Sequence, residues 1–227
     1  MKLVIANKRY SSWSLRPWLL MRVLDLPFEE VLIPLGRPDT RETILRHAPT
    51  GRVPVLLDGE ATVWESLAIM DHLADCHAPG RVWPEAPAAR AMARAVAAEM
   101  HAGFAALRQA CPMNLGLRFP FRDRGEACAA DIARVEALVR EARRRFGSGG
   151  PFLFGAFSAA DAMYAPVATR LDTYGIPLEP ETAAWVEAVL DLPAYRAWLD
   201  AALAEPWTLP RIDGQEEPEA VLGTKSV

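Results

Sequence analysis

The sequence has few cysteines and few histidines, and their spacing excludes two classes of site. Only 3 of its 227 residues are cysteine, and Cys76, Cys111 and Cys128 lie too far apart for a disulfide framework or a zinc motif. The 4 histidines also lack the spacing of metal ligands. In particular, the gap between His72 and His77 does not place both on one helix face. We therefore predict no metal site.

Charge and hydropathy exclude further classes of protein. The net charge of -4 and the pI of about 5.6 argue against a general binder of nucleic acid or anionic membranes. No apolar run reaches the roughly 18 residues of a membrane-spanning helix. The run Leu3–Ala6 is too short for the core of a secretory signal, and no glycine-rich phosphate loop is present. We expect a soluble, cytoplasmic protein in a reducing compartment.

The apolar patterning, with 51% hydrophobic residues, is sufficient for a large core and predicts two unlike halves. Residues 1–78 predict strands and helices in the order β-α-β-α-β-β-α, and the proline-rich segment 79–87 predicts a linker. The alanine-rich remainder predicts a helical domain over 88–210 and a polar tail over 211–227, frayed from Gln215 onward. The expected strands cover 3–6, 29–35, 53–57 and 61–64, and the expected helices cover 15–24, 40–47, 67–77, 88–110, 126–146, 158–174, 181–190 and 193–204.

Three serines stand where the first expected strand passes into the first expected helix. Ser11, Ser12 and Ser14 are residues that favour helix N-caps, and Pro17 fits the first turn of a helix. The helix should therefore begin near Ser14 or Leu15. Because a helix N-terminus favours negative charge, the stretch could hold an anion beside serine hydroxyls. An ordinary helix cap is the alternative that this stretch leaves open.

Two later dipeptides could likewise form either a ligand-binding site or an ordinary structural feature. Proline is unusual inside a strand, so Val53-Pro54 indicates either a cis bond that turns the Val53 backbone outward or an edge strand. An outward backbone could pair with an extended peptide. At the next strand-to-helix junction, Ser66 could receive a carboxylate and Glu65 an ammonium group, or the pair could be an ordinary cap.

A fourth motif is structural. Ser158 and Asp161 have the spacing of a capping box, with Asp in place of the usual Glu, and they should begin a buried helix. Pro166 lies well inside that helix and should kink it.

Taken together, three segments resemble the glutathione-site motifs of cytosolic glutathione transferases in identity, order and spacing. They are SSWSLR from Ser11, GRVPVL from Gly51 and WESLAI from Trp64. Ser158 and Asp161 match that family's capping box in the helical domain, so the resemblance covers about residues 1–205. The Ser-Ser-x-Ser-x-Arg form is most similar to the serine-type branch near the zeta class.

The resemblance implies an α/β plus all-α fold, with a thioredoxin-like domain over 1–78 and an all-helical domain over 88–210. It also implies a homodimer, glutathione as co-substrate and no metal. Ser11 matches the family's catalytic serine and Ser12 is the alternative. The implied glutathione-binding residues are Trp13, Arg52, Val53, Pro54, Glu65 and Ser66, with Val53 at the cysteinyl backbone across a cis Pro54, Glu65 and Ser66 at the γ-glutamyl end, and Arg52 or His47 at the glycyl carboxylate.

The implied function is transfer of glutathione to a small electrophile, with the thiol activated as thiolate. A glutathione-dependent isomerase and a non-catalytic ligand- or protein-binding module of the same fold are the alternatives. Trp13 stands where zeta-class proteins carry a cysteine, which argues against the isomerisation typical of that class. No cysteine stands at Ser11, which disfavours mixed-disulfide chemistry. We expect residues 101–121 and Tyr164 to contribute to the electrophile pocket.

Overall fold

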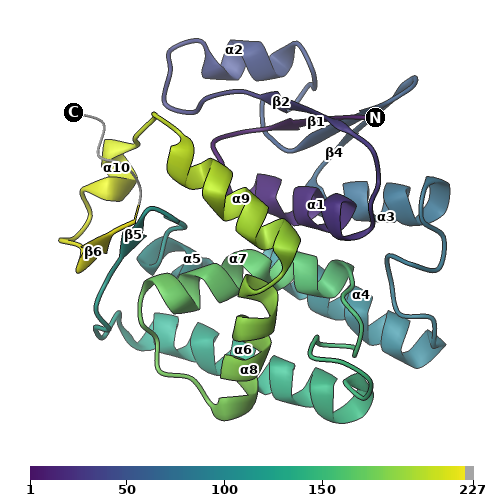
Figure 1. The fold of residues 1–227 in the computed structure, drawn as a ribbon, viewed down its shortest axis with the longest axis vertical. Coiled ribbons are helices and arrows are strands. Elements are labelled where there is room, and N and C mark those ends of the chain that lie inside the picture. The colour runs from purple at the N-terminus through teal and green to yellow at the C-terminus, as the bar shows by residue number, and fades with distance from the viewer. Residues whose placement is uncertain (223–227) are drawn as a thin grey trace.

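The computed structural model describes residues 1–222, and it places a small sheet with its helices against a larger set of helices (Figure 1). The predicted strand and helix order of the first 78 residues is confirmed, as is the helical second half. The N-terminal elements are β1 (Lys2–Ile5), α1 (Ser12–Val23), β2 (Glu29–Leu32), α2 (Thr40–Leu45), β3 (Val55–Asp58), β4 (Ala61–Trp64) and α3 (Ser66–Cys76).

The sheet has the strand order β2-β1-β3-β4. β1 runs parallel to β2, with α1 as the crossover between them, and antiparallel to β3. β3 and β4 form a hairpin in which Asp58 pairs with Ala61 across the turn at Gly59, which has a φ of 59°. An Asp-Gly dipeptide is common at such hairpin turns.

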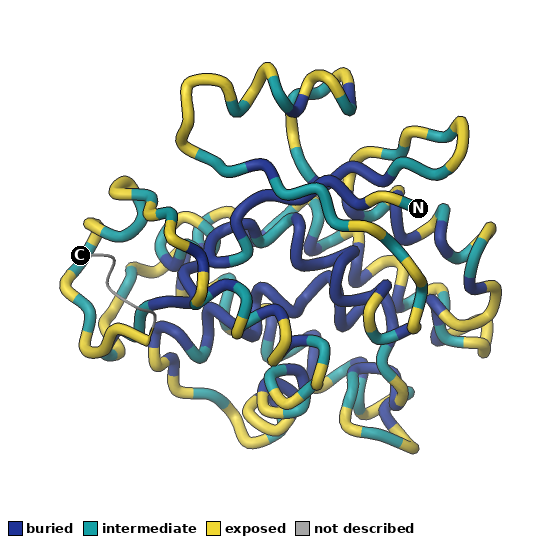
Figure 2. Tube along the Cα trace, turned by 45° about the horizontal axis from the view of Figure 1, so that its top comes forward, coloured by how far each residue is buried: buried dark blue, intermediate teal, exposed yellow. Residues whose placement is uncertain are grey.

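The second half of the described chain is mostly helical. Its central helix, α7, is buried along almost its whole length (Figure 2). The predicted capping box at its start is confirmed, because Ser158 and Asp161 exchange both hydrogen bonds with each other's backbone. The elements of this half are α4 (Pro87–Ala102), α5 (Ala105–Ala110), β5 (Leu117–Arg118), α6 (Glu126–Phe146), α7 (Ala159–Thr173), α8 (Pro180–Leu190), α9 (Pro193–Ala204), α10 (Pro210–Asp213) and β6 (Ala220–Val221).

One large apolar core joins the two halves. α1 packs against α3 on the sheet side and against α7 and α9 of the helical side. The core contains Leu15 and Leu19 of α1 together with Met163 and Ala165 of α7, all without solvent exposure. The N-terminus of α1 is therefore held at the junction between the sheet and the helices.

The first helix begins earlier than predicted. α1 starts at Ser12, because Ser11 is its N-cap and accepts a hydrogen bond from the Ser14 N–H. Pro17 consequently lies inside the helix and not in its first turn. The prediction was wrong because it used the proline to set the boundary. The serine cap sets it, and the helix tolerates one missing donor in its second turn.

Two further predictions fail in the second half. The single helix expected over 88–110 is two helices, because the chain turns at Gly103 and at Phe104, which has a left-handed φ of 57°.

The tail is also not frayed from Gln215 onward. β6 pairs with β5, and Glu216 forms an ion pair with Arg124. Residues 223–227 of the tail lie outside the described part of the chain, and the domain boundaries stay a prediction.

Candidate active site at the start of two helices

The serine stretch forms a short hydrogen-bonded chain at the N-terminus of α1. The Ser11 hydroxyl is buried and lies 2.8 Å from the Ser14 hydroxyl, which in turn accepts a hydrogen bond from the Ala6 N–H at 3.1 Å. The Ser14 N–H also points to Ser11 Oγ, at 3.4 Å. Ser12 is half-buried, and within residues 1–222 its hydroxyl makes no hydrogen bond. Ser11 is thus fixed in position, whereas the Ser12 hydroxyl has no bonded partner in this part of the chain.

Two arginines lie close to the Trp13 ring. The guanidinium of Arg16 is 4.0 Å from the centre of the ring and that of Arg108 is 5.3 Å away, and His101 meets the ring edge-on at 5.4 Å. Arg16 is completely buried and donates to the Ser12 carbonyl at 2.9 Å, and burial lowers its pKa. The indole is therefore held in place by cation–π contacts, and it makes no side-chain hydrogen bond within residues 1–222.

The Val53–Pro54 peptide bond is cis, as one interpretation of the sequence predicts. Val53 lies outside β3, which begins at Val55. Within residues 1–222 its backbone N–H and C=O make no hydrogen bond to another backbone group. These groups are available to an extended peptide beside the sheet.

Glu65 and Ser66 occupy the junction between β4 and α3. Glu65 is the N-cap and has a φ of 70°, an unusual conformation for a residue with a side chain. Its carboxylate faces His101 at 3.7 Å. Because Ser66 is the first helical residue, its N–H is one of the unbonded donors at the helix start. Its hydroxyl, however, is buried and donates to the Met163 sulfur at 3.7 Å, so the predicted hydroxyl contact to a carboxylate requires this weak bond to break.

Two cavities flank these residues. The first has a volume of about 300 Å³ and extends from Trp13 and Val53 to Glu65, His101 and Arg108. The second has a volume of about 510 Å³. Both are bordered by Trp13, Arg52 and Val53. The other residues of the second cavity that matter for the chemistry are Tyr10, Ser11, Ser12, Arg37, Arg41, Leu209, Arg211 and Ile212.

The structure brings together most, but not all, of the residues that the sequence singles out. Ser66 borders neither cavity. It could contact a ligand only through its backbone N–H at the start of α3. His47 also borders neither cavity, so Arg52 is better placed than His47 to contact a glycyl carboxylate. Tyr164, expected in the electrophile pocket, is fully buried, and burial raises its pKa far above the usual range. It packs against Phe104 inside the helical domain.

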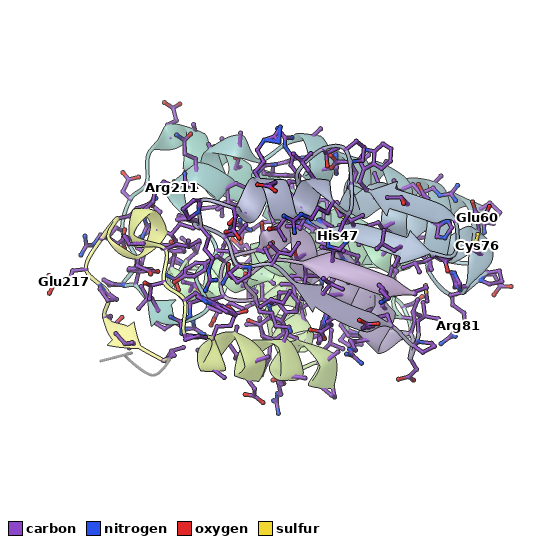
Figure 3. All side chains as sticks on the ribbon, turned by 90° about the horizontal axis from the view of Figure 1, so that it is seen from above. His47, Glu60, Cys76, Arg81, Arg211 and Glu217 are labelled. Atoms are coloured by element: carbon purple, nitrogen blue, oxygen red, sulfur yellow. The ribbon has the colours of Figure 1, made fainter. Side chains whose placement is uncertain are left out.

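Other residues at the site were not predicted individually. Arg108 was included only within a broad range, and its role as a partner of Trp13 depends on the break after α4 that the sequence did not reveal. The wall made by α10 was missed as well, because a four-residue helix has no periodicity to detect. Asp213 anchors this helix by accepting hydrogen bonds from the Tyr10 hydroxyl at 2.8 Å and from Asn114 at 2.7 Å. Arg211 lies at the end of the molecule opposite to Glu60 and Cys76 (Figure 3).

Two family models match the chain and cover most of it. Residues 10–76 match the "Glutathione S-transferase, N-terminal domain" and residues 91–201 match the "Glutathione S-transferase, C-terminal domain". The chain belongs to the glutathione S-transferase family. The thioredoxin-like sheet and the all-helical second domain are the fold of this family, as the resemblance implied. Among residues 1–222, none of the helices has the length and hydropathy of a membrane span.

Curated glutathione S-transferases are similar to the chain over most of its length. GstB of Escherichia coli K12 is 28% identical over 193 residues, which cover 78% of this chain and 88% of GstB. Glutathione S-transferase theta-1 of Mus musculus is 28% identical over 73% of this chain and 72% of its own length. A dichloromethane dehalogenase of Methylorubrum extorquens is 47% identical, but over only 22% of this chain and 18% of the dehalogenase.

Solved structures of glutathione transferases share the fold. A homologue from Burkholderia with bound glutathione superposes with a TM-score of 0.66 at 22% identity, covering 88% of this chain and 97% of the homologue. A theta-class enzyme from Xanthomonas axonopodis pv. citri, also with glutathione bound, has a TM-score of 0.63 at 24% identity over 87% of this chain and 96% of its own. Members of this fold thus hold glutathione.

Proposed function

We propose that this glutathione S-transferase family member conjugates glutathione to a small electrophile, with Ser11 stabilising the thiolate. The observation that supports this most is the hydrogen-bonded chain from the Ala6 N–H through Ser14 to Ser11, which ends at a cavity beside Val53. A hydroxyl can donate and accept at once. When a thiolate is bound, Ser14 can donate to Ser11 Oγ, and the Ser11 proton is then free to be donated to sulfur.

Glutathione fits the site as an extended peptide laid along Val53. The cysteinyl backbone pairs with the N–H and C=O of Val53 beside the cis Pro54. The γ-glutamyl carboxylate meets the N-terminus of α3 at Ser66, and the ammonium group meets Glu65 in place of His101. The glycyl carboxylate extends towards Arg52, which borders both cavities.

The energies are sufficient for thiolate formation without a metal or a buried base. A free thiol has a pKa of about 8.5, and lowering it by about two units needs roughly 2.7 kcal/mol. A hydrogen bond to a charged group contributes about 1.5–3 kcal/mol, and a helix N-terminus adds about 0.3–1 kcal/mol. Ser11 combines both contributions, because it is the N-cap of α1.

The second cavity is suited to the electrophile. Leu209 and Ile212 of the α10 region supply an apolar wall, and Arg37 and Arg211 supply positive charge. The thiolate sulfur attacks the electrophilic carbon and forms a C–S bond. In a substitution, the displaced group leaves with the electron pair of the broken bond. In an addition, the broken π bond leaves its electron pair on the electrophile, which then takes up a proton from solvent. The positive wall stabilises negative charge that develops on that group.

Three finer assignments accompany this proposal. The Ser-Ser-x-Ser-x-Arg form supports a place in the serine-type branch near the zeta class. The resemblance supports a homodimer, which light scattering coupled to size-exclusion chromatography would test. The low cysteine content and the family support a cytoplasmic location.

The decisive experiment compares Ser11→Ala with Ser12→Ala and the parent protein. We measure the glutathione dissociation constant by calorimetry and conjugation of a model electrophile by absorbance. The proposal predicts that Ser11→Ala lowers kcat about 10- to 100-fold, the value of one hydrogen bond to a charged sulfur, with little change in glutathione affinity. Ser12→Ala should stay close to the parent. Unchanged turnover in both variants contradicts the serine mechanism, and glutathione binding without any turnover favours the non-catalytic module.

A further inference from the structure

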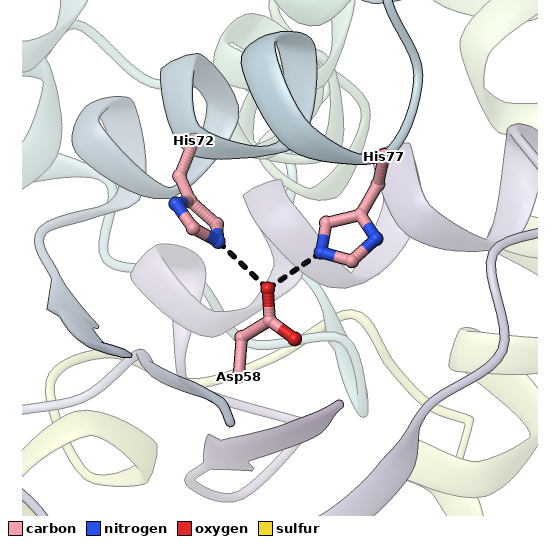
Figure 4. A group of neighbouring side chains, drawn as sticks. All are labelled: Asp58, His72 and His77. Carbon is pink, nitrogen blue, oxygen red and sulfur yellow. Dashed lines mark hydrogen bonds and ion pairs between the residues drawn. The ribbon is translucent and has the colours of Figure 1, made fainter. Parts of the chain in front are cut away.

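Two histidines and one aspartate converge away from the proposed active site, at the far ends of β3 and α3. His72 Nε2 lies 2.8 Å from Asp58 Oδ2, and His77 Nε2 lies 2.5 Å from the same oxygen (Figure 4). The three ligand atoms all lie within 4.8 Å of one another. The side chains of Asp58, His72 and His77 are each about a quarter exposed, so an ion from solvent can reach them.

His72 and His77 approach each other at the end of α3, where the spacing rule for a continuous helix no longer applies. A separation of five residues places two side chains on different faces of a continuous helix. α3, however, ends at Cys76, and His77 is its C-cap with a φ of -125°. The chain leaves the helical path there, and the His77 ring comes round to within 5.8 Å of the His72 ring. The five-residue spacing therefore does not keep the two rings apart, because His77 lies at the helix end.

We propose that Asp58, His72 and His77 bind a divalent transition-metal ion, with Zn²⁺ as the best-suited one. Two imidazole nitrogens and one carboxylate oxygen form a ligand set that zinc uses, with a water molecule completing a tetrahedron. Ligands at about 2.0–2.1 Å from zinc stand roughly 3.3 Å apart in a tetrahedron. The present separations, from 2.5 Å to within 4.8 Å, need only small side-chain rotations to reach that geometry.

Two surrounding features support a cation at this position. The C-terminal end of α3 carries the negative pole of the helix dipole. On the other side of the His72 ring, Nδ1 lies 3.8 Å from the Cys76 sulfur one helical turn later, where the thiol can fix the ring orientation.

The site is separate from the proposed glutathione site. Asp58 ends the strand that begins at Val55, so the two residues are about 10 Å apart at the usual rise of a strand. Cys76 ends the helix that begins at Ser66, about 15 Å away at the rise of a helix. A bound ion would join the β3–β4 hairpin to the end of α3 without touching Ser11 or Glu65.

The test is a calorimetric titration of the chelator-treated full chain with Zn²⁺, together with thermal unfolding in the presence and absence of the ion. We compare the parent with His72→Gln and His77→Gln, and His47→Gln is the matched control outside the cluster. Circular dichroism of each variant without metal tests whether the variant is folded. Asp58→Asn serves as a further variant if either histidine variant fails to fold.

The proposal predicts one Zn²⁺ per chain, a rise in Tm on metal addition, and at least a tenfold loss of affinity in both histidine variants. His47→Gln should bind as the parent does. In addition, Co²⁺ should give the strong visible absorption of a tetrahedral site. Absence of stoichiometric Zn²⁺ binding overturns the proposal, as does binding that is unchanged when either His72 or His77 is replaced.

Discussion

Ser14 lies behind Ser11, and its hydroxyl makes no contact with either cavity. It accepts from the Ala6 N–H and shares a hydrogen bond with Ser11. If it positions Ser11, Ser14→Ala should raise the pKa of bound glutathione and lower kcat, with a smaller effect than Ser11→Ala. The bound-thiol pKa separates this role from a purely structural one. A bound-thiol pKa equal to that of the parent contradicts the positioning role.

Glu65 tests how the γ-glutamyl end is held. Glu65→Gln removes the negative charge but keeps the size of the side chain and the backbone at its φ of 70°. Because the side chain is about half exposed, we expect the lower end of the charged hydrogen-bond range, about a tenfold weaker affinity for glutathione. The bound-thiol pKa should not change. Glu60→Gln, in the exposed β3–β4 turn, is the matched control, and equal affinity in both variants contradicts the assignment.

Residue identity predicted the capping box, and it gave the cis bond at Val53–Pro54 as one of two interpretations, because each depends on neighbours in sequence. It did not predict the partners of Trp13 or the direction of the Ser66 hydroxyl. Those depend on Arg108 and Met163, which lie far along the chain. The two histidines at the end of α3 illustrate the same limit, since their meeting depends on where the helix stops.

Among the single elements, α10 is the part of the candidate site that sequence periodicity did not predict. This helix contributes to the wall of the second cavity, and Asp213 holds it by accepting bonds from Tyr10, Asn114 and the Leu209 N–H. Burial, followed by the hydrogen bond to Asp213, raises the pKa of Tyr10 to about 12. The longer elements, such as α6, agree with their sequence periodicity because their apolar faces extend over many turns.

Asp213→Ala should release α10 and open the second cavity. The KM for a hydrophobic electrophile should rise while the glutathione affinity stays the same, because Asp213 borders neither cavity. The pKa of Tyr10 should fall from about 12 towards its ordinary value, because release of α10 reduces the burial of Tyr10 and the accepting carboxylate is lost. Ultraviolet titration of tyrosinate, compared with a Tyr10→Phe variant, measures this shift. An unchanged Tyr10 pKa contradicts the anchoring role of Asp213.

At the scale of the whole molecule, the two domains share one core. Residues of α1 and α7 belong to the same buried cluster, and Arg16 of α1 donates to the Met163 carbonyl of α7 at 2.9 Å. The linker in the sequence suggests separable domains, but composition cannot show which buried faces meet. The position of the candidate active site at this junction follows from that shared packing.

We expect the domains to unfold together. Calorimetry at a fixed protein concentration should give one transition, with a calorimetric enthalpy close to the van't Hoff value. A fragment ending at residue 86 should not fold alone, because it would expose the face of α1 that packs on α7. Two resolved transitions, or a folded fragment, contradict this expectation.

If this site holds glutathione as a thiolate beside Ser11, the pKa of the bound thiol should reveal it. The measurement is a pH titration of the thiolate absorbance of glutathione bound to the parent protein and to Ser11→Ala. The proposed mechanism predicts a bound-thiol pKa about two units below that of the free thiol in the parent, and a return most of the way to the free value in the variant. An unshifted pKa in the parent would contradict thiol activation, and a shift that survives in Ser11→Ala would contradict the role of Ser11.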